Sequence, residues 1–144
     1  LTLSSLTLMG QSVLNSIPNQ KKIDGSYVSN PDQILNASTI AQIDSLLTAL
    51  EKSKGIQISI VALNSIGEED VFTLAQELFS NWGIGSKSRD EGLLILLVKD
   101  QRTIRFHTGY GLEGQLPDVV CKRIQRDYML PHFKNNDYDA GMLA

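Results

Sequence analysis

The stretch RDEGLLILLVKDQRTIRFHTGYGLEGQLPD, residues 89–118, decides the fold of this chain. It contains six consecutive apolar residues, 93–98, a pattern typical of a strand buried on both faces or of a short buried helix segment. Gly92 before the run and the polar residues 99–101 after it favour the strand. We therefore expect a buried strand that ends in a tight turn.

A second strand is predicted directly after this turn. Residues 103–108 alternate β-branched and aromatic side chains with Arg105 and His107, which indicates a half-exposed strand that pairs with the first as a hairpin. A hairpin returns the chain to the side it left, so the flanking loops, 90–92 and 109–114, should meet at one end of the sheet. Both loops are rich in glycine and carboxylates, which makes this end the best candidate for a functional site.

Helical and alternating patterns elsewhere predict three helices, at residues 38–53, 71–82 and 116–134, and one more strand, at residues 56–63. Asn36 or Ser38 is suited to cap the first helix, and Gly55 is placed to end it. Strands that alternate with helices predict an α/β fold whose sheet is covered on both faces.

The last predicted helix carries an apolar stripe of residues four apart, Leu116, Val120, Ile124 and Tyr128, which we expect to be buried. Pro131 should end or kink the helix. The basic residues of this segment also recur at helical spacing, which indicates a solvated face (Lys122, Arg123, Arg126).

Composition indicates an ordinary soluble domain. The chain has 144 residues, enough for one domain with a substantial core, and a net charge of −3, which implies no general attraction to nucleic acid. The single cysteine, Cys121, excludes an internal disulfide, and the sequence has no Cys/His spacing for zinc. We expect Cys121 to be a core or boundary residue.

We divide the chain at residue 19. Residues 1–19 lack a periodic apolar face and are too short to span a membrane, so we expect a flexible tail or a signal-peptide remnant. Residues 20–144 form the expected domain, which we take to be part of a longer protein.

Several motifs of this domain are similar to those of the TPM domain family. They are Trp82-Gly83-Ile84-Gly85, Asp90-Glu91-Gly92-Leu93-Leu94, Gly109-Tyr110-Gly111-Leu112-Glu113-Gly114 with Leu116-Pro117-Asp118, Pro131-His132-Phe133-Lys134, and Asp137-Tyr138. That family includes a thylakoid-lumen photosystem II repair protein, an auxiliary subunit of a nematode acetylcholine receptor and many bacterial envelope proteins. The resemblance covers residues 26–144.

The resemblance implies a three-layer α/β/α sandwich around a mixed, mostly parallel sheet. It also implies a location outside the cytoplasm, in the periplasm or cell envelope, often with a membrane tether beyond the domain. Some members resemble calcium binders, and the plant member has been assigned an acid phosphatase activity. Two motifs depart from the family pattern: Asn30 stands where an Asp is usual, and Asp90-Glu91-Gly92 stands where Asn-Asn-Gly or Asp-Asn-Gly is frequent.

Four carboxylates in or just after the two loops form the candidate metal site: Asp90, Glu91, Glu113 and Asp118. Carboxylates brought together repel one another unless a cation offsets their charge. Calcium accepts carboxylate and carbonyl oxygens in loose geometry, and magnesium is the alternative ion. Solvated loop acids and ordinary turn glycines are the competing interpretation, and Asp118 also suits the start of a helix.

Two functions follow from these residues as hypotheses. The first is a calcium-binding domain that serves as an interaction or assembly module with a membrane-protein or envelope partner, without membrane insertion by this segment. The alternative is a metal-dependent acid phosphatase of low specificity, in which the metal polarises a phosphoryl oxygen and Arg89 or Arg105 holds the phosphate. No phosphatase nucleophile motif is present, and neither His107 nor His132 has a clear role as an acid.

Overall fold

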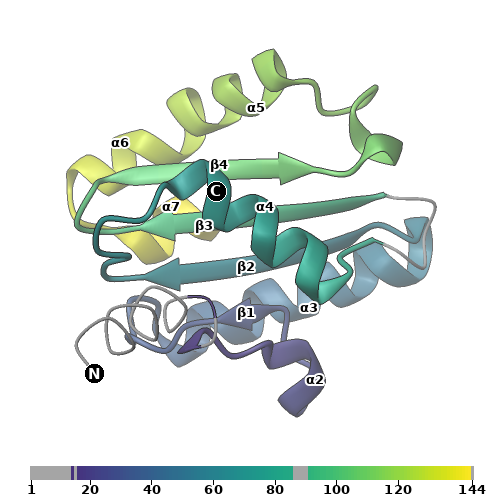
Figure 1. Cartoon of the computed structure of the whole chain (residues 1–144), viewed down its shortest axis with the longest axis horizontal. Coiled ribbons are helices and arrows are strands. Elements are labelled where there is room, and N and C mark those ends of the chain that lie inside the picture. Colours follow the sequence, from purple (N-terminus) through teal and green to yellow (C-terminus); the bar gives the residue numbers. More distant parts are fainter. Residues whose placement is uncertain (1–13, 15, 86–90, 144) are drawn as a thin grey trace, which may run out of the picture.

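A computed structural model describes residues 14, 16–85 and 91–143 of the chain. Its four-stranded sheet has the order β1-β2-β3-β4, in which the first three strands are parallel and the fourth is antiparallel (Figure 1). The strands are β1 (Val28–Ser29), β2 (Gln57–Leu63), β3 (Gly92–Val98) and β4 (Thr103–Thr108). The sheet is therefore mixed and mostly parallel, as predicted.

Helices cover both faces of the sheet, which confirms the three-layer α/β/α sandwich. One face packs against α4 (Val71–Trp82), which lies in front of the sheet in Figure 1. The other face is covered by α3 (Ala37–Lys54) and by the C-terminal helices. Those are α5 (Asp118–Ile124), the π-helical turn η2 (Gln125–Met129), α6 (Leu130–Lys134) and α7 (Tyr138–Leu143).

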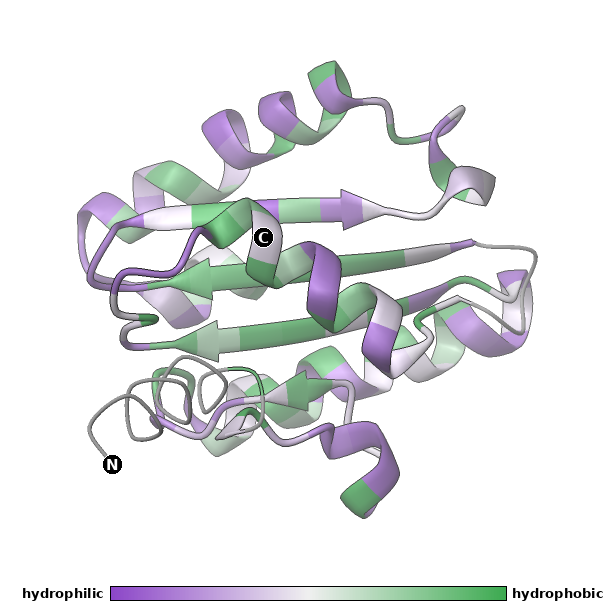
Figure 2. Cartoon of the chain, viewed as in Figure 1, coloured by the Kyte–Doolittle hydropathy of each residue, from purple (hydrophilic) through white to green (hydrophobic). Residues whose placement is uncertain are grey.

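The apolar run of β3 is explained by its central position. Leu93 and Leu97 belong to the core under α3 and the C-terminal helices, whereas Leu94 and Leu96 belong to the core under α4. A strand buried on both faces needs apolar residues at every position rather than at every second one. The continuous hydrophobic colouring of β3 in Figure 2 reflects this.

The predicted hairpin is confirmed. Leu93 pairs with Thr108 and Val98 with Thr103, and the four residues between the strands form the turn. Two predicted helices, which correspond to α3 and α4, also agree closely with the structure. The Asn36 side chain accepts a hydrogen bond from the Thr39 N–H at the start of α3, and Gly55 ends this helix in the left-handed conformation.

The predicted apolar stripe of the last helix is wrong at Tyr128, which is 58% exposed. The π-helical turn η2 adds a residue to one turn and rotates the helix, so that Met129 is buried instead. Cys121 is buried, as predicted. The turn η2 ends two residues before Pro131, whose nitrogen cannot donate a helical hydrogen bond, and the chain remains helical beyond Pro131.

The N-terminal part contains elements that the sequence pattern did not predict, the short helix α2 (Gln20–Asp24) and the two-residue strand β1. Most of the expected tail, residues 1–13 and 15, lies outside the described residues. Within the described part Ile17 is only 6% exposed and joins the core under α4. The Ser29 hydroxyl donates a 2.6 Å hydrogen bond to the Pro18 carbonyl, which ties this segment to β1.

None of the helices in the described part of the chain is long and apolar enough to cross a membrane.

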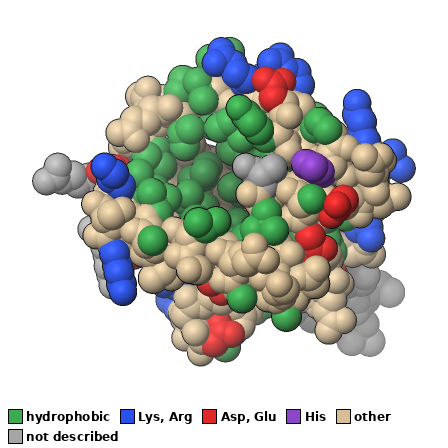
Figure 3. All heavy atoms as spheres, turned by 180° about the vertical axis from the view of Figure 1, so that it is seen from behind, with side chains coloured by type: hydrophobic (Ala, Val, Ile, Leu, Met, Phe, Trp, Pro, Cys, Tyr) green, Lys and Arg blue, Asp and Glu red, His purple; other side chains and the backbone are tan. Residues whose placement is uncertain are grey.

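The helices do not close completely over the sheet. Seen from behind, the surface has a hollow lined by hydrophobic side chains (Figure 3). Several apolar residues packed against this core are only partly buried, among them Ile56, Ile58, Ile95 and Leu116.

Candidate functional site

The two loops that flank the hairpin lie at the same end of the sheet, as predicted. The Gly109 N–H donates a 2.9 Å hydrogen bond to the Gly92 carbonyl, so the chain leaving β4 touches the residue that begins β3. The Gln57 N–H donates to the Glu91 carbonyl over 3.1 Å, which joins the start of β2 to the same place. We call this the acidic end, defined by Glu91, Gly92 and residues 109–118.

Gly92 is required at the acidic end by a close approach of two backbones. A Cβ atom on Gly92 would lie 2.8 Å from the Ile84 carbonyl oxygen and 2.9 Å from the Gly85 Cα. A Cβ on Gly85 would lie 2.6 Å from the Gly92 nitrogen, and Gly85 also has a φ of +77°. The absence of a side chain at Gly85 and Gly92 therefore allows these two parts of the backbone to lie in direct contact.

The glycine-rich segment after β4 forms a 3-10 turn, η1 (Tyr110–Leu112). Leu112 is buried and anchors this turn, whereas Tyr110 is 83% exposed and Glu113 is exposed. The carbonyls of Gly109, Tyr110 and Leu112 accept hydrogen bonds from backbone N–H groups within the segment. The turn thus presents one carboxylate and one phenol to solvent, with much of its backbone engaged internally.

Asp118 lies in the first turn of α5 and is exposed. A carboxylate there suits the helix dipole, so this residue has a structural role apart from any ligand. Burial, and secondarily the Asp118 charge, raise the pKa of the Cys121 thiol. A thiol that resists ionisation is a poor nucleophile, which fits the structural role predicted for Cys121.

The metal-ligand set remains a prediction. Of the candidate ligands, Glu91, Glu113 and Asp118 are described, whereas Asp90 lies outside the described residues. Arg89, a candidate for holding the phosphate in the enzyme hypothesis, also lies outside them. Among the residues the structure describes, no group of three or more His, Cys, Asp or Glu side chains is placed to hold a metal ion.

Asn30, the residue that departs from the family pattern, organises the loop between β1 and α3. Its Oδ1 accepts hydrogen bonds from the N–H groups of Ile34 and Leu35, at 2.9 and 3.2 Å. Its Nδ2 donates to the Leu35 carbonyl at 2.7 Å, a bond that an ionised aspartate cannot make. The amide therefore has a structural explanation at this position.

Arg105 and His107 face α4. The Arg105 guanidinium lies 4.5 Å from the centre of the Phe72 ring, and the His107 ring lies 4.7 Å from that of Phe79. Arg105 Nε and His107 Nδ1 are buried without a hydrogen-bond partner among the described residues. Burial and, to a smaller extent, the Arg105 charge lower the pKa of His107.

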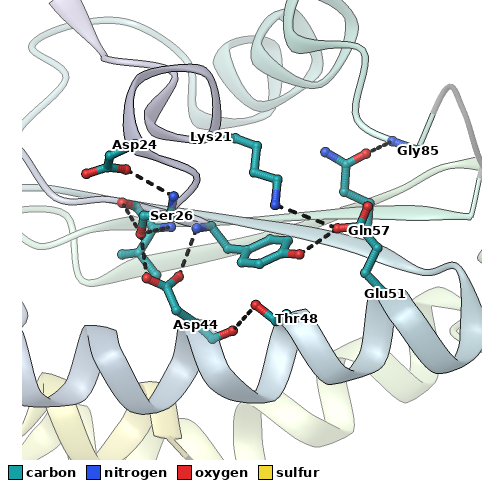
Figure 4. Close-up of polar contacts among 10 residues, drawn as sticks. Lys21, Asp24, Ser26, Asp44, Thr48, Glu51, Gln57 and Gly85 are labelled. Carbon is teal, nitrogen blue, oxygen red and sulfur yellow. Dashed lines mark hydrogen bonds and ion pairs between the residues drawn. The ribbon is translucent and has the colours of Figure 1, made fainter.

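A polar network that the sequence pattern missed joins α2, β1 and α3 (Figure 4). The Tyr27 hydroxyl donates a 2.6 Å hydrogen bond to Glu51, while Lys21 lies 3.8 Å from that carboxylate and 3.6 Å from the centre of the Tyr27 ring. Asp44 accepts bonds from the Ser26 hydroxyl and the Tyr27 N–H, both at 2.8 Å. Beside it lies a cavity of about 260 Å³ lined by Lys21, Lys22, Glu51, Gln57 and Trp82, among others.

The opposite end of the sheet, where β2 and β3 finish, holds a hollow of about 190 Å³. We call it the carboxyl-end hollow. Its lining residues are Leu97, Arg102, Leu130, Phe133, Lys134 and Tyr138. They span about forty positions of the sequence, from β3 to α7, and no local motif links them. Only the folded chain brings them together.

The fold and this arrangement of loops define a class of small α/β/α domain with a mixed four-stranded sheet and glycine-rich loops at one end. The TPM domain family model matches residues 28–144. The chain therefore belongs to the TPM domain family. The name of that family model includes the word phosphatase.

Three solved structures share the fold. The N-terminal domain of a protein from P. gingivalis has a TM-score of 0.82 and 35% identity, and the match covers 90% of this chain and 83% of that one. The BA42 protein of Bizionia argentinensis has a TM-score of 0.66 and 20% identity, with 78% and 77% covered. The N-terminal domain of the cg2496 protein of Corynebacterium glutamicum has a TM-score of 0.63 and 17% identity, with 83% and 74% covered. No curated protein matches the chain.

Proposed function

We propose that this TPM domain binds a divalent cation, calcium by ligand chemistry with magnesium as the alternative, at the acidic end of its sheet. The observation that carries the proposal is the 2.9 Å hydrogen bond between the Gly109 N–H and the Gly92 carbonyl. It brings the loop that contains Glu91 to the loop that contains Glu113. Asp90 precedes Glu91 in the sequence and supplies the further carboxylate.

The ligand chemistry favours a hard, weakly directional ion. Calcium takes six to eight oxygen ligands and tolerates irregular geometry, whereas magnesium requires a near-octahedral site. Glu113 and Asp118 are exposed, so the site would form from surface carboxylates that converge when the ion binds. Such sites of low preorganisation bind calcium weakly, with dissociation constants of about 10⁻⁴ to 10⁻³ M for extracellular modules.

Calorimetric titration of calcium into charge variants tests this proposal. We expect Glu113→Gln and Asp90→Asn each to weaken calcium binding by about tenfold, since one lost charge-assisted contact corresponds to roughly 1.5 kcal/mol. Lys122→Gln on the exposed face of α5 and Asp100→Asn in the β3–β4 turn are the matched controls and should bind normally. Equal affinity of all four variants would contradict the proposal.

The localisation and partner follow from the same proposal. We place the domain outside the cytoplasm, where calcium is abundant enough to occupy a weak site, as an interaction or assembly module of the cell envelope. The exposed Tyr110 beside Glu113 would then contribute to a calcium-dependent contact with an envelope protein. Crosslinking through a photoreactive group at position 110, with calcium and with a chelator, tests this. Products that do not depend on calcium would count against it.

A metal-dependent phosphomonoesterase is the second candidate, favoured by the name of the matching family model. In that case the cation would polarise a phosphoryl oxygen for attack by water. Arg105 packs on Phe72 across the α4 face, which leaves it poorly suited to hold the phosphate. We expect hydrolysis of a phosphomonoester, if present, to be lost in Asp118→Asn and retained in Arg105→Gln.

A further inference from the structure

The carboxyl-end hollow has an apolar floor. Leu97 and Tyr138 are buried, and Leu130 and Phe133 are half-buried. Its volume of about 190 Å³ is similar to that of an apolar cavity of about 150 Å³ that binds benzene. The hollow is therefore large enough for one ring or one branched aliphatic group.

The aromatic side chains of the hollow pack closely against a glycine of α7. The rings of Phe133 and Tyr138 stack with their centres 5.4 Å apart and their planes 26° from parallel. A Cβ atom on Gly141 would lie 2.3 Å from the Phe133 ring, so the ring can pack this closely against α7 only because residue 141 has no side chain. The position of these rings is thus set by packing.

The rim of the hollow is cationic. Arg102 and Lys134 line it, and Lys99 lies 5.4 Å from the centre of the Tyr138 ring. None of these three cations forms an ion pair within the described part of the chain, where the ion pairs are Lys21–Glu51 and Arg126–Asp127.

Two carboxylates of this corner, Asp137 and Asp139, accept hydrogen bonds from backbone N–H groups. Asp139 accepts a 2.8 Å hydrogen bond from the Asn36 N–H, and Asp137 accepts one of 3.0 Å from the Ala140 N–H. Asp100, in the same turn as Arg102, is exposed. The side chains that line the hollow itself include two cations and no carboxylate.

Arg102 also stands at a strained backbone position. Its φ is +51°, in the left-handed region that favours glycine or asparagine, and its N–H closes the turn on the Lys99 carbonyl at 3.1 Å. Glycine would adopt this backbone conformation with less strain. A long cationic side chain at a strained backbone position is the kind of outlier that accompanies ligand sites.

We propose that the carboxyl-end hollow binds a small amphiphilic anion, a carboxylate attached to a single aromatic or branched aliphatic group. The apolar group would lie on Leu97, Phe133 and Tyr138, and the carboxylate would contact Arg102 and Lys134 at the rim. This site is at the opposite end of the sheet from the acidic end and is independent of the cation proposal. Both a free acid and the C-terminal residue of a peptide carry this chemistry.

The test is an NMR titration of the ¹⁵N-labelled domain with 3-phenylpropionate. We expect the acid to shift the amides of the residues that line the hollow, among them Leu97, Arg102 and Tyr138. We also expect the neutral 3-phenylpropanol to bind about tenfold more weakly, because it lacks the charge-assisted contact. A tripeptide ending in phenylalanine, compared with its C-terminal amide, shows whether the carboxyl terminus of a peptide is accepted as well.

Arg102→Gly makes the test independent of folding. Because glycine relieves the strained turn, we expect the melting temperature to rise while 3-phenylpropionate binding falls about tenfold. Arg123→Gly, a cation removed from the exposed face of α5, is the control that should keep binding. Gly141→Ala should weaken binding of acid and alcohol alike, because it displaces the Phe133 ring.

The proposal is overturned if the alcohol binds as tightly as the acid, if Arg102→Gly binds 3-phenylpropionate like the unmodified chain, or if the amides around the hollow do not shift up to the solubility limit of the acid.

Discussion

The two ends of the sheet differ in how their functional groups are presented. At the acidic end, glycines bring backbones together while the carboxylates of Glu113 and Asp118 remain in solvent. At the carboxyl end, helices α6 and α7 and the β3–β4 turn enclose an apolar hollow with Arg102 and Lys134 at its rim. The first is a set of exposed carboxylates, whereas the second is a hollow formed by the packing of apolar side chains.

The two candidate sites also differ in the charge of their side chains, with carboxylates in the loops of the acidic end and with Arg102 and Lys134 at the rim of the hollow. The formal charge of the chain is only −3. A cation and an anion would each find a favourable end, and neither end would compete for the ligand of the other. The following predictions break or sharpen this contrast, from the largest expected effect to the smallest.

The largest effect is expected at the acidic end. Gly92→Ala would place a Cβ within 3 Å of the Ile84 carbonyl and the Gly85 backbone, which cannot move as a flexible side chain would. We expect the free energy of unfolding to fall by more than about 3 kcal/mol in chemical denaturation. Gly114→Ala, whose Cβ meets no atom within 4 Å, is the control at the same end. Equal losses in the two variants would show that the close approach is not what Gly92 provides.

A smaller effect is expected where the N-terminal segment supports the carboxyl end. Ile17 packs in the same apolar core as Leu63 and Val98, the last residues of β2 and β3. We expect Ile17→Ala to lower the free energy of unfolding by about 2 to 3 kcal/mol. Ile23→Ala is the matched control, because Ile23 is 65% exposed. A neutral Ile17→Ala would mean that the segment does not contribute to stability.

The smallest effect is expected in the pH dependence of stability, through His107 in β4. The pKa of His107 is lowered from its ordinary value of 6.5, by burial first and by the Arg105 charge second. The unfolded chain therefore takes up the proton more readily, so the stability linked to this group is fully present above pH 6.5 and decreases as the pH falls below it. His107→Gln should flatten this part of the curve of stability against pH, measured by chemical denaturation. An unchanged curve in His107→Gln would assign the pH dependence to other groups.

The sequence predicted the elements best where one physical signal dominated. The six apolar residues of β3 and the caps of α3 are local patterns, and the structure agrees with them. Tyr128 was misplaced because a π-helical turn changes the helical period without a signature in the spacing. Strand β1 was missed because two residues carry no period, and its pairing with β2 depends on contacts distant in sequence.

The candidate sites show the same division. The meeting of the loops at Gly92 and Gly109 could be predicted from the hairpin, because its register returns the chain to one end. The carboxyl-end hollow could not, since its walls come from β3, a turn, α6 and α7. The positive φ of Arg102 and the contact of Gly141 with Phe133 exist only in the folded chain.

The most direct test of the central claim, that the acidic end binds a cation, is a calcium titration of the ¹⁵N-labelled domain followed by NMR. The account predicts saturable shifts of the amides of Glu91, Gly109, Gly111 and Glu113, with those of Arg102 and Tyr138 unchanged. If millimolar calcium, about the level expected to fill a weak extracellular site, left the acidic end unshifted, the proposed cation site would be contradicted.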